Sequence, residues 1–323
     1  MKAIVQDTYG SADVLRVEDI DKPEIGDDHL LVRVQAAGVD AGVWHVMTGL
    51  PYMIRIMGYG LRAPKSRVRG SDFAGRVEAA GPNVTRFRPG DEVFGACDGS
   101  FAEYVSVKEK NCAPKPANLT FEQAAAVPVS GLTALQGIRD HGKVQAGQRV
   151  LVTGAGGGVG TFAVQIAEAL GAEVTGVCST GKVDTVRSIG AAHVIDYTRE
   201  DFTRSDRRWD LILDTGGNRS LSHLRRALTP RGTLVIVGGE GGDRWIGGTD
   251  RQLRALLLSP FVGHNLRTFV ARILPEDLLF LKELIEAGKV TPVLDRAYPL
   301  SQAAAAVRHL AERRAKGKVV ITV

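Results

Sequence analysis

A cluster of glycines between residues 154 and 160 has the clearest chemical meaning in this sequence. Glycines at 154, 157 and 160 fall three apart, with further ones at 156 and 158. Because glycine has no Cβ, the backbone can turn sharply here and approach a bound group closely. Apolar residues 150–152 precede the cluster and apolar residues at helical spacing follow it, so we expect a strand, a tight turn and a helix. The amides of the helix's first turn then form a site for a pyrophosphate.

The glycine spacing departs from the strict dinucleotide-binding pattern, because Val159 stands where the third glycine would be counted from Gly154. The surrounding sequence supports the assignment nevertheless. Residues 172–177 predict a second strand at the expected distance, and apolar runs at 210–213 and 233–237 continue the alternation of strands and helices. The alternative is that the glycines serve only close helix packing. We predict a nucleotide-binding parallel sheet.

Length and composition indicate a globular chain with more than one domain. The 323 residues exceed most single domains, and 44% hydrophobic with 24% charged residues is ordinary for such a chain. No apolar run approaches the roughly 20 residues of a membrane span, and the N-terminus lacks the apolar core of a signal peptide. The net charge of +5 is a mild excess without a nucleic-acid-binding motif, so nucleic-acid binding is not predicted as a main role.

The three cysteines, at 97, 112 and 178, are too few and too scattered for a disulfide framework or a paired-cysteine metal site. This usage is typical of a reducing compartment. We therefore expect a cytoplasmic protein.

Residues 1–120 are predicted to form a β-rich, barrel-like domain. Short apolar or alternating runs are separated there by Gly, Pro, Asn and Asp. Residues 40–55 interrupt them with large side chains and no consistent period. We interpret this stretch as a helical turn plus a loop, which forms the wall of a pocket, a local core, or both.

Residues 121–272 are predicted to form the nucleotide-binding domain. Thr120 opens a T-x-x-Q pattern that resembles a capping box, and a helix over 130–139 leads into the glycine cluster. A glycine-rich loop is expected at 238–250, where a strand ends. Residues 273–323 hold two helices and a last strand with no partner in a nucleotide-binding fold, so we expect this tail to return to the first domain.

With these features, the chain resembles the medium-chain dehydrogenase/reductase superfamily, and within it the zinc-independent branch that includes quinone oxidoreductases. The resemblance covers nearly the whole length. It implies an α/β fold in which a GroES-like β-barrel domain joins a Rossmann domain, a doubly wound parallel sheet, with the cofactor in the cleft between them. The motifs that carry it are AAGVD (36–40), GSDFAGRVEAAGPNVTRFRPGDEVFG (70–95), AAAVPVSGLTALQGI (124–138), TGAGGGVG (153–160), GAAHVIDYTREDF (190–202) and RAKGKVVI (314–321).

Zinc-dependent members of this superfamily hold a catalytic metal with cysteine, histidine and cysteine. The matching positions here are Asp40, Ser71 and Val129, and the lobe with four closely spaced cysteines is absent. The resemblance therefore implies no metal. Without that Lewis acid nothing obvious lowers the pKa of an alcohol, so we favour reduction of a quinone or an α,β-unsaturated carbonyl.

The resemblance places Asp40 and His45 in the substrate wall, as the candidate catalytic residues. Relatives often carry asparagine at the first position and tyrosine or lysine at the second, so the chain departs from the pattern at both. Because histidines titrate near neutral pH, His45 can donate a proton to a developing enolate or quinol oxygen. The alternative is a packing or surface residue.

The end of the second predicted strand indicates which nicotinamide cofactor binds. NAD-specific domains usually carry a carboxylate there for the ribose 2′-hydroxyl, whereas this chain has Ser179 and Lys182 and no carboxylate before Asp184. Both side chains can donate to a 2′-phosphate, so we expect NADPH, unless Lys182 is merely a solvated loop residue. The predicted cofactor-binding residues are Thr133, Gly154, Gly157, Gly158, Val159, Ser179, Lys182, Tyr197, Gly238, Phe269 and Lys316.

We therefore predict a zinc-independent, NADPH-dependent oxidoreductase that transfers hydride to a small-molecule quinone or α,β-unsaturated carbonyl. Two alternatives stay open. One is an NADP-dependent alcohol or carbonyl dehydrogenase, and the other is a non-catalytic NADPH-binding sensor or interaction protein. A homodimer is also expected, because relatives pair through edge strands of their Rossmann sheets and residues 266–271 are an apolar run suited to such an edge.

Overall fold

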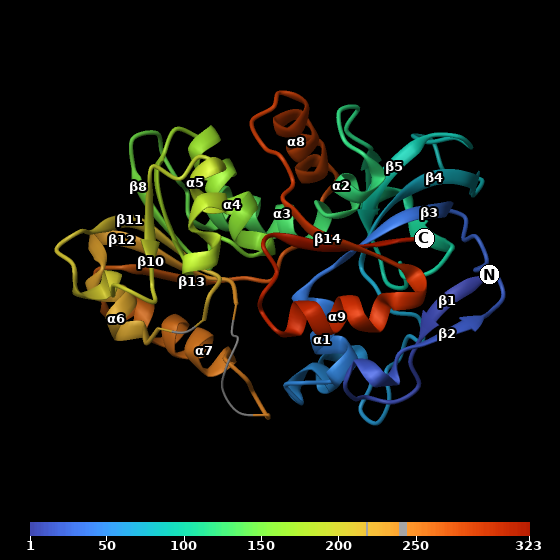
Figure 1. Cartoon of the computed structure of the whole chain (residues 1–323), viewed down its shortest axis with the longest axis horizontal. Helices are drawn as coiled ribbons and strands as arrows, with labels where there is room; N and C mark the ends of the chain where they lie inside the picture. The colour runs from blue at the N-terminus through green and yellow to red at the C-terminus, as the bar shows by residue number, and fades with distance from the viewer. Residues whose placement is uncertain (218, 239–243) are drawn as a thin grey trace. The chain divides into compact units, whose positions relative to one another are not determined.

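The structure, a computed structural model, describes residues 1–217, 219–238 and 244–323 (Figure 1). The chain forms two compact units. The first comprises Met1–Leu132, Ile273–Ala287 and Pro292–Val323. The second comprises Thr133–Arg272 and Gly288–Thr291.

The first unit is built on a seven-stranded sheet in the order β14-β15-β3-β4-β5-β7, with β6 also paired to β3. A separate two-stranded ribbon consists of β1 (Lys2–Val5) and β2 (Arg16–Asp19). The strands of the larger sheet are β3 (His29–Val39), β4 (Asp72–Ala80), β5 (Glu92–Ala96), β6 (Tyr104–Lys108), β7 (Cys112–Pro114), β14 (Leu294–Pro299) and β15 (Lys318–Thr322).

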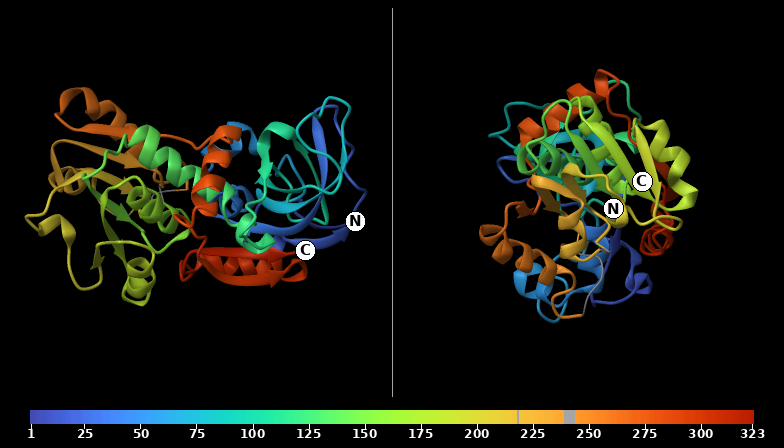
Figure 2. Two further views of the ribbon diagram at one scale, coloured as in Figure 1. Left: turned by 90° about the horizontal axis from the view of Figure 1, so that it is seen from above. Right: turned by 90° about the vertical axis from the view of Figure 1, so that its left-hand side faces the viewer.

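The C-terminal strand belongs to the sheet formed by the first part of the chain. β15 runs antiparallel to β3, with Val319 opposite Val39, and the red and blue ribbons lie side by side in Figures 1 and 2. The shared core includes Phe73 and Phe101 from the N-terminal part and Val307 from the C-terminal part. The helices of this unit are α1 (Ala41–Thr48), α2 (Phe121–Ala125), α8 (Pro275–Glu286) and α9 (Ala303–Ala311).

The second unit is a six-stranded, fully parallel sheet in the order β10-β9-β8-β11-β12-β13. This order reverses direction between β8 and β11, as in a doubly wound nucleotide-binding sheet, so the predicted fold of this part is confirmed. The strands are β8 (Arg149–Thr153), β9 (Glu173–Cys178), β10 (His193–Asp196), β11 (Trp209–Asp214), β12 (Leu228–Ile236) and β13 (Asn265–Thr268).

Helices cover both faces of this sheet (Figure 1). On one face lie α4 (Gly158–Ala169) and α5 (Val183–Ser188), and on the other lie α6 (Leu221–Arg226) and α7 (Thr249–Leu258). The second face buries Leu224 and Ala255 from its helices against strand residues such as Ile212. In the described ranges no helix combines the length and the apolar character that a membrane span requires.

Two predicted elements differ in extent from the observed ones. The helix expected over 130–139 is α3 (Pro128–Leu135), followed by a π-helical turn over Gln136–His141. Proline is compatible with a first helical turn because its missing N–H would have no partner there. The edge strand expected over 266–271 ends at Thr268, after which the ring of Phe269 stacks on His141 with centroids 4.3 Å apart.

Candidate functional site

The glycine-rich turn joins β8 to α4 in the second unit. Gly154 has a φ of +67°, and a Cβ there would lie 2.5 Å from Thr215 Oγ1, so the position requires glycine. Gly157 caps α4 without a side-chain hydrogen bond. The first-turn amides, including those of Gly158 and Val159, have no helical carbonyl to bind. They are free to bind an anion at the topological switch point of the sheet, where nucleotides bind.

Lys182 lies against this turn. A Cβ built on Gly156 would be only 2.8 Å from the Cβ and Cδ of Lys182, so the lysine stem crosses directly over that glycine. Ser179 follows β9 and Tyr197 follows β10, and the amide of Tyr197 donates to the carbonyl of Cys178 at 3.1 Å. The predicted residues of the 2′-phosphate site therefore gather at the carboxyl ends of two neighbouring strands.

Two carboxylates lie in the same region as Lys182, one in α5 and one at the end of β10. Asp184 has a side chain that is 99% exposed and lies 3.5 Å from Arg187. Asp196 accepts hydrogen bonds from Thr180 Oγ1 at 2.5 Å and from Thr198 Oγ1 at 2.7 Å. These hydrogen bonds, that of Thr180 foremost, lower the pKa of Asp196. Asp196 was not identified from the sequence.

A buried ion pair stands at the carboxyl ends of the central strands. Arg251 Nη2 lies 2.6 Å from Asp214 Oδ2, and the same guanidinium donates to the carbonyl oxygen of Gly238 at 3.1 Å. Gly238 is a predicted cofactor-binding residue, and residues 239–243 of the glycine-rich loop expected at 238–250 lie outside the described residues. Sequence reasoning missed this pair, although an aspartate that ends an apolar strand is a recognisable signal.

Three other predicted cofactor-binding residues, Thr133, Phe269 and Lys316, lie outside the glycine-rich turn and the two strand ends described above. Thr133 is half-buried in α3, and Phe269 stacks on His141. Lys316 belongs to the first unit, where it is exposed just before β15. Contacts of these three residues with a cofactor stay predictions.

The three positions that match zinc ligands lie in the first unit. Ser71 Oγ donates to Asp40 Oδ2 at 2.6 Å, and Asp40 Oδ1 accepts from the amide of Val43 at 3.1 Å, so this carboxylate caps α1. Val129 supplies no ligating atom from its side chain. No three His, Cys, Asp or Glu side chains in residues 1–217, 219–238 and 244–323 are grouped to hold a metal. These residues do not fit a zinc ion.

A second buried ion pair adjoins these positions. Lys318 Nζ lies 3.2 Å from Asp72 Oδ2 and donates to Ser130 Oγ at 3.1 Å, while the amide of Val129 donates to Asp72 Oδ1 at 2.9 Å. Burial raises the pKa of Asp72 to about 7 although Lys318 opposes the shift, and the nearby Asp40 adds to it. This group was not predicted from the sequence, where its signal is a charged residue at the first position of each of two strands.

His45 lies in the second half of α1. Its Nδ1 is 2.8 Å from the carbonyl oxygen of Leu50, and because a carbonyl only accepts, Nδ1 carries the proton in this contact. The other ring nitrogen, Nε2, does not take part in this hydrogen bond. The side chain is partly exposed, with the ring of Trp44 edge-on to it.

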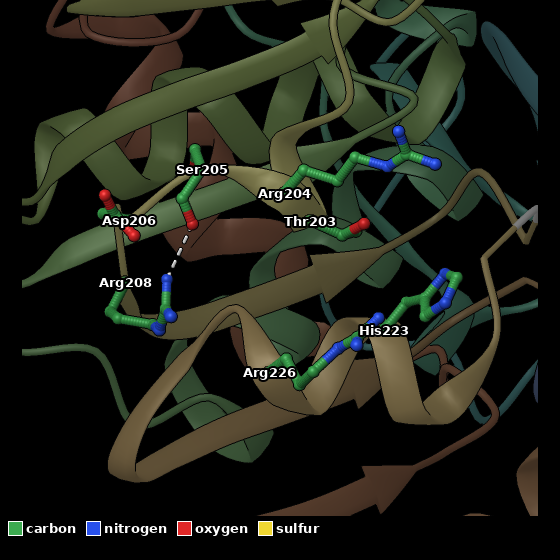
Figure 3. A pocket seen from close by; sticks show the side chains of 7 residues that line it. All are labelled: Thr203, Arg204, Ser205, Asp206, Arg208, His223 and Arg226. Atoms are coloured by element: carbon green, nitrogen blue, oxygen red, sulfur yellow. Dashed lines mark hydrogen bonds between the residues drawn. The ribbon is translucent and has the colours of Figure 1, made fainter.

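A cavity of about 560 Å³ in the second unit is lined by none of the predicted site residues (Figure 3). Arg204 and Arg208 line it from the segment before β11, and His223 and Arg226 line it from α6. Arg208 donates to the carbonyl of Ser205 at 2.8 Å. This cavity is therefore not the site that the chemistry of the glycine-rich turn indicates.

Comparison with known families matches both parts of the chain. Residues 26–117 match the family model described as an alcohol dehydrogenase GroES-like domain, and residues 189–321 match one described as a zinc-binding dehydrogenase. The second match does not include the three positions that correspond to zinc ligands.

Relatives cover nearly the full chain. A 2-methylene-furan-3-one reductase of Solanum lycopersicum is 33% identical over 99% of this chain and 79% of its own length. A chloroplastic NADPH-dependent alkenal/one oxidoreductase of Arabidopsis thaliana is 32% identical over the same shares.

Solved structures share the whole architecture. A quinone oxidoreductase of Coxiella burnetii has a TM-score of 0.87 at 27% identity and covers 100% of this chain and 99% of its own. A protein described as an NAD-dependent alcohol dehydrogenase has a TM-score of 0.85 at 30% identity, with 100% of both chains covered. With a GroES-like domain followed by a doubly wound parallel sheet, this chain belongs to the medium-chain dehydrogenase/reductase superfamily and is a nicotinamide-dependent oxidoreductase.

Proposed function

We propose that this oxidoreductase is zinc-independent, uses NADPH, and reduces a quinone or an α,β-unsaturated carbonyl. The observation that carries the proposal is the 2.6 Å hydrogen bond between Ser71 and Asp40, at two of the positions that hold zinc in zinc-dependent relatives. With valine at the third position, these side chains offer no ligand set for a Lewis acid. An acceptor that is already activated can be reduced without one. The names of the tomato, Arabidopsis and Coxiella proteins support this substrate class.

When bound, NADPH supplies the hydride, and the chain binds and orients it. The first-turn amides of α4 fit the pyrophosphate. Ser179, Lys182 and Tyr197 fit the 2′-phosphate end, and Thr133 is proposed to lie near the nicotinamide. In the first unit, Asp40 holds α1 through its cap, and His45 on that helix donates a proton to the acceptor oxygen.

Steady-state kinetics tests the proposed reaction. Oxidation of NADPH with 1,4-benzoquinone and with an enone is compared with reduction of NADP⁺ by simple alcohols. We expect turnover only in the first set. Turnover confined to alcohols would favour the alcohol dehydrogenase alternative, which the structurally similar alcohol dehydrogenase supports. Tight NADPH binding without turnover of any acceptor would favour a sensor.

Replacing Lys182 by alanine tests the choice of NADPH. The 2′-phosphate is the chemical difference between the two cofactors, and Lys182 lies across the glycine-rich turn. We expect the dissociation constant of NADPH to rise about tenfold, the loss of one charged hydrogen bond, with that of NADH unchanged. Ser179→Asp is expected to weaken NADPH further by repulsion and to favour NADH. Fluorescence titration at low and high salt measures these constants, and salt reduces the difference by screening.

The matched control is Lys289→Ala, which removes an exposed lysine of the same unit. It is expected to leave both dissociation constants unchanged. An equal rise for NADPH and NADH in Lys182→Ala would mean that the lysine acts through loop structure, and the assignment of NADPH would lose its main support.

We further propose a homodimer through the free edge of the second unit's sheet. β13 is the edge strand, and the neighbouring Val270 and Phe261 are 83% and 84% exposed. Light scattering is expected to give about twice the 34.6 kDa of one chain. Val270→Lys is expected to shift the protein to the monomer, whereas Val17→Lys, at an exposed valine of the first unit, is not. A monomer for the unmodified protein at micromolar concentration contradicts the proposal.

A further inference from the structure

The buried ion pair of the second unit joins three loops at the carboxyl edge of its sheet. Asp214 ends β11 and Arg251 lies in the first turn of α7, with 1% and 12% of their side chains exposed. Two buried charges stabilise a fold only when further hydrogen bonds satisfy them. Both partners here make such bonds, and the bonds reach different loops.

The guanidinium of Arg251 reaches three acceptors. Besides Asp214, it donates from Nη1 to the carbonyl of Arg219 at 2.9 Å and from Nη2 to the carbonyl of Gly238 at 3.1 Å. Arg219 belongs to the loop after β11, and Gly238 follows β12. A planar, forked donor is the side chain that can join such acceptors in fixed directions.

The carboxylate of Asp214 connects the same pair to the glycine-rich turn. Its Oδ1 accepts from Thr153 Oγ1 at 2.5 Å, and Thr153 directly precedes Gly154. Thr153 in turn accepts from the amide of Gly216 at 3.2 Å, and its carbonyl accepts from Thr215 Oγ1 at 2.6 Å. A continuous set of contacts therefore leads from Arg251 to the start of the turn.

We infer that Arg251 is a positioning residue which, directly and through Asp214, holds the backbone at Thr153, Arg219 and Gly238 in the conformation that binds the nicotinamide cofactor. The inference rests on the proposed function, which puts the cofactor at these loops. Without the forked side chain, the backbone at these three positions must be ordered when the cofactor binds. The entropy lost in that ordering lowers the affinity for the cofactor. Because the loops adjoin the part of the cofactor that NADPH and NADH share, both are affected equally.

The test compares Arg251→Met and Arg251→Lys with the unmodified protein. Cofactor fluorescence measures the dissociation constants of NADPH and NADH, and circular dichroism measures Tm. Arg251→Met is expected to lower Tm and to raise both constants about tenfold. Lysine restores the charge opposite Asp214 but cannot reach the three acceptors at once. Arg251→Lys is therefore expected to recover most of the lost Tm while both constants stay raised.

Arg254→Met is the matched control, because Arg254 lies on the same helix with a side chain that is 75% exposed. It is expected to leave the constants within about twofold of the unmodified protein. Unmodified affinity in Arg251→Lys, or an effect on NADPH alone, would overturn the inference while the proposed function stands. An unmodified protein that binds neither nucleotide would overturn both.

Discussion

Replacing Lys318 by methionine is expected to lower the free energy of unfolding by about 3–5 kcal/mol at pH values above 7, where the Asp72 carboxylate is ionised and is left buried without its cation. The two side chains are 2% and 0% exposed, and Lys318 also donates to Ser130. The loss therefore affects strand β15, strand β4 and the start of α3 together. Urea unfolding followed by circular dichroism measures it.

Two variants separate the ion pair from general packing. Lys108→Met removes an exposed lysine of the same sheet and is expected to change the free energy of unfolding by less than about 0.5 kcal/mol. The double variant Asp72→Asn with Lys318→Met is expected to recover much of the loss, because no uncompensated charge stays buried. A double variant as unstable as Lys318→Met alone would show that packing, and not charge, is the cause.

The pH dependence of stability follows from the same carboxyl group. Burial raises the pKa of Asp72 from 3.8 to about 7, so the folded state binds this proton more tightly than the unfolded state. Its contribution to stability is then fully present below pH 3.8 and is lost as the pH rises through about 7. The free energy of unfolding, taken relative to Asp72→Asn, is expected to fall over this range.

Replacing His45 by asparagine is expected to lower kcat for enone reduction about 100-fold, the usual size of a general-acid contribution. The amide nitrogen of asparagine occupies roughly the place of Nδ1 and can keep the hydrogen bond to the carbonyl of Leu50. What the variant lacks is Nε2, the proton donor.

Stopped-flow measurement of single turnovers, together with cofactor titration, distinguishes chemistry from binding. The dissociation constant of NADPH is expected to stay unchanged in His45→Asn. His193→Asn serves as the control, because His193 is exposed and forms a hydrogen bond with Glu173. This variant is expected to leave kcat unchanged. If kcat persists in His45→Asn, the proton comes from water or another group and His45 is a packing residue.

Local patterns in the sequence predicted the secondary-structure elements around the proposed cofactor site. The strand, glycine cluster and helix around Gly154 are signalled by neighbouring residues, and so is the capping box at Thr120, where both reciprocal hydrogen bonds are confirmed. The lack of a zinc-ligand set at positions 40, 71 and 129 also depends on residue types alone, since the Val129 side chain has no ligating atom wherever it lies. These features depend on the conformational preferences of a few neighbouring residues or on side-chain chemistry, and both follow directly from the sequence.

Only the tertiary structure decided which charged side chains meet. Lys318 and Asp72 are 246 residues apart, and the Asp214 carboxylate receives its hydrogen bond from Thr153, 61 residues earlier. A lone charge in an apolar strand predicts burial beside a partner, but the partner depends on the order and register of the strands. That order is set by burial of the whole core, which acts between segments distant in the sequence. For the same reason the hydrogen bond between Ser71 and Asp40 could not be predicted from local patterns.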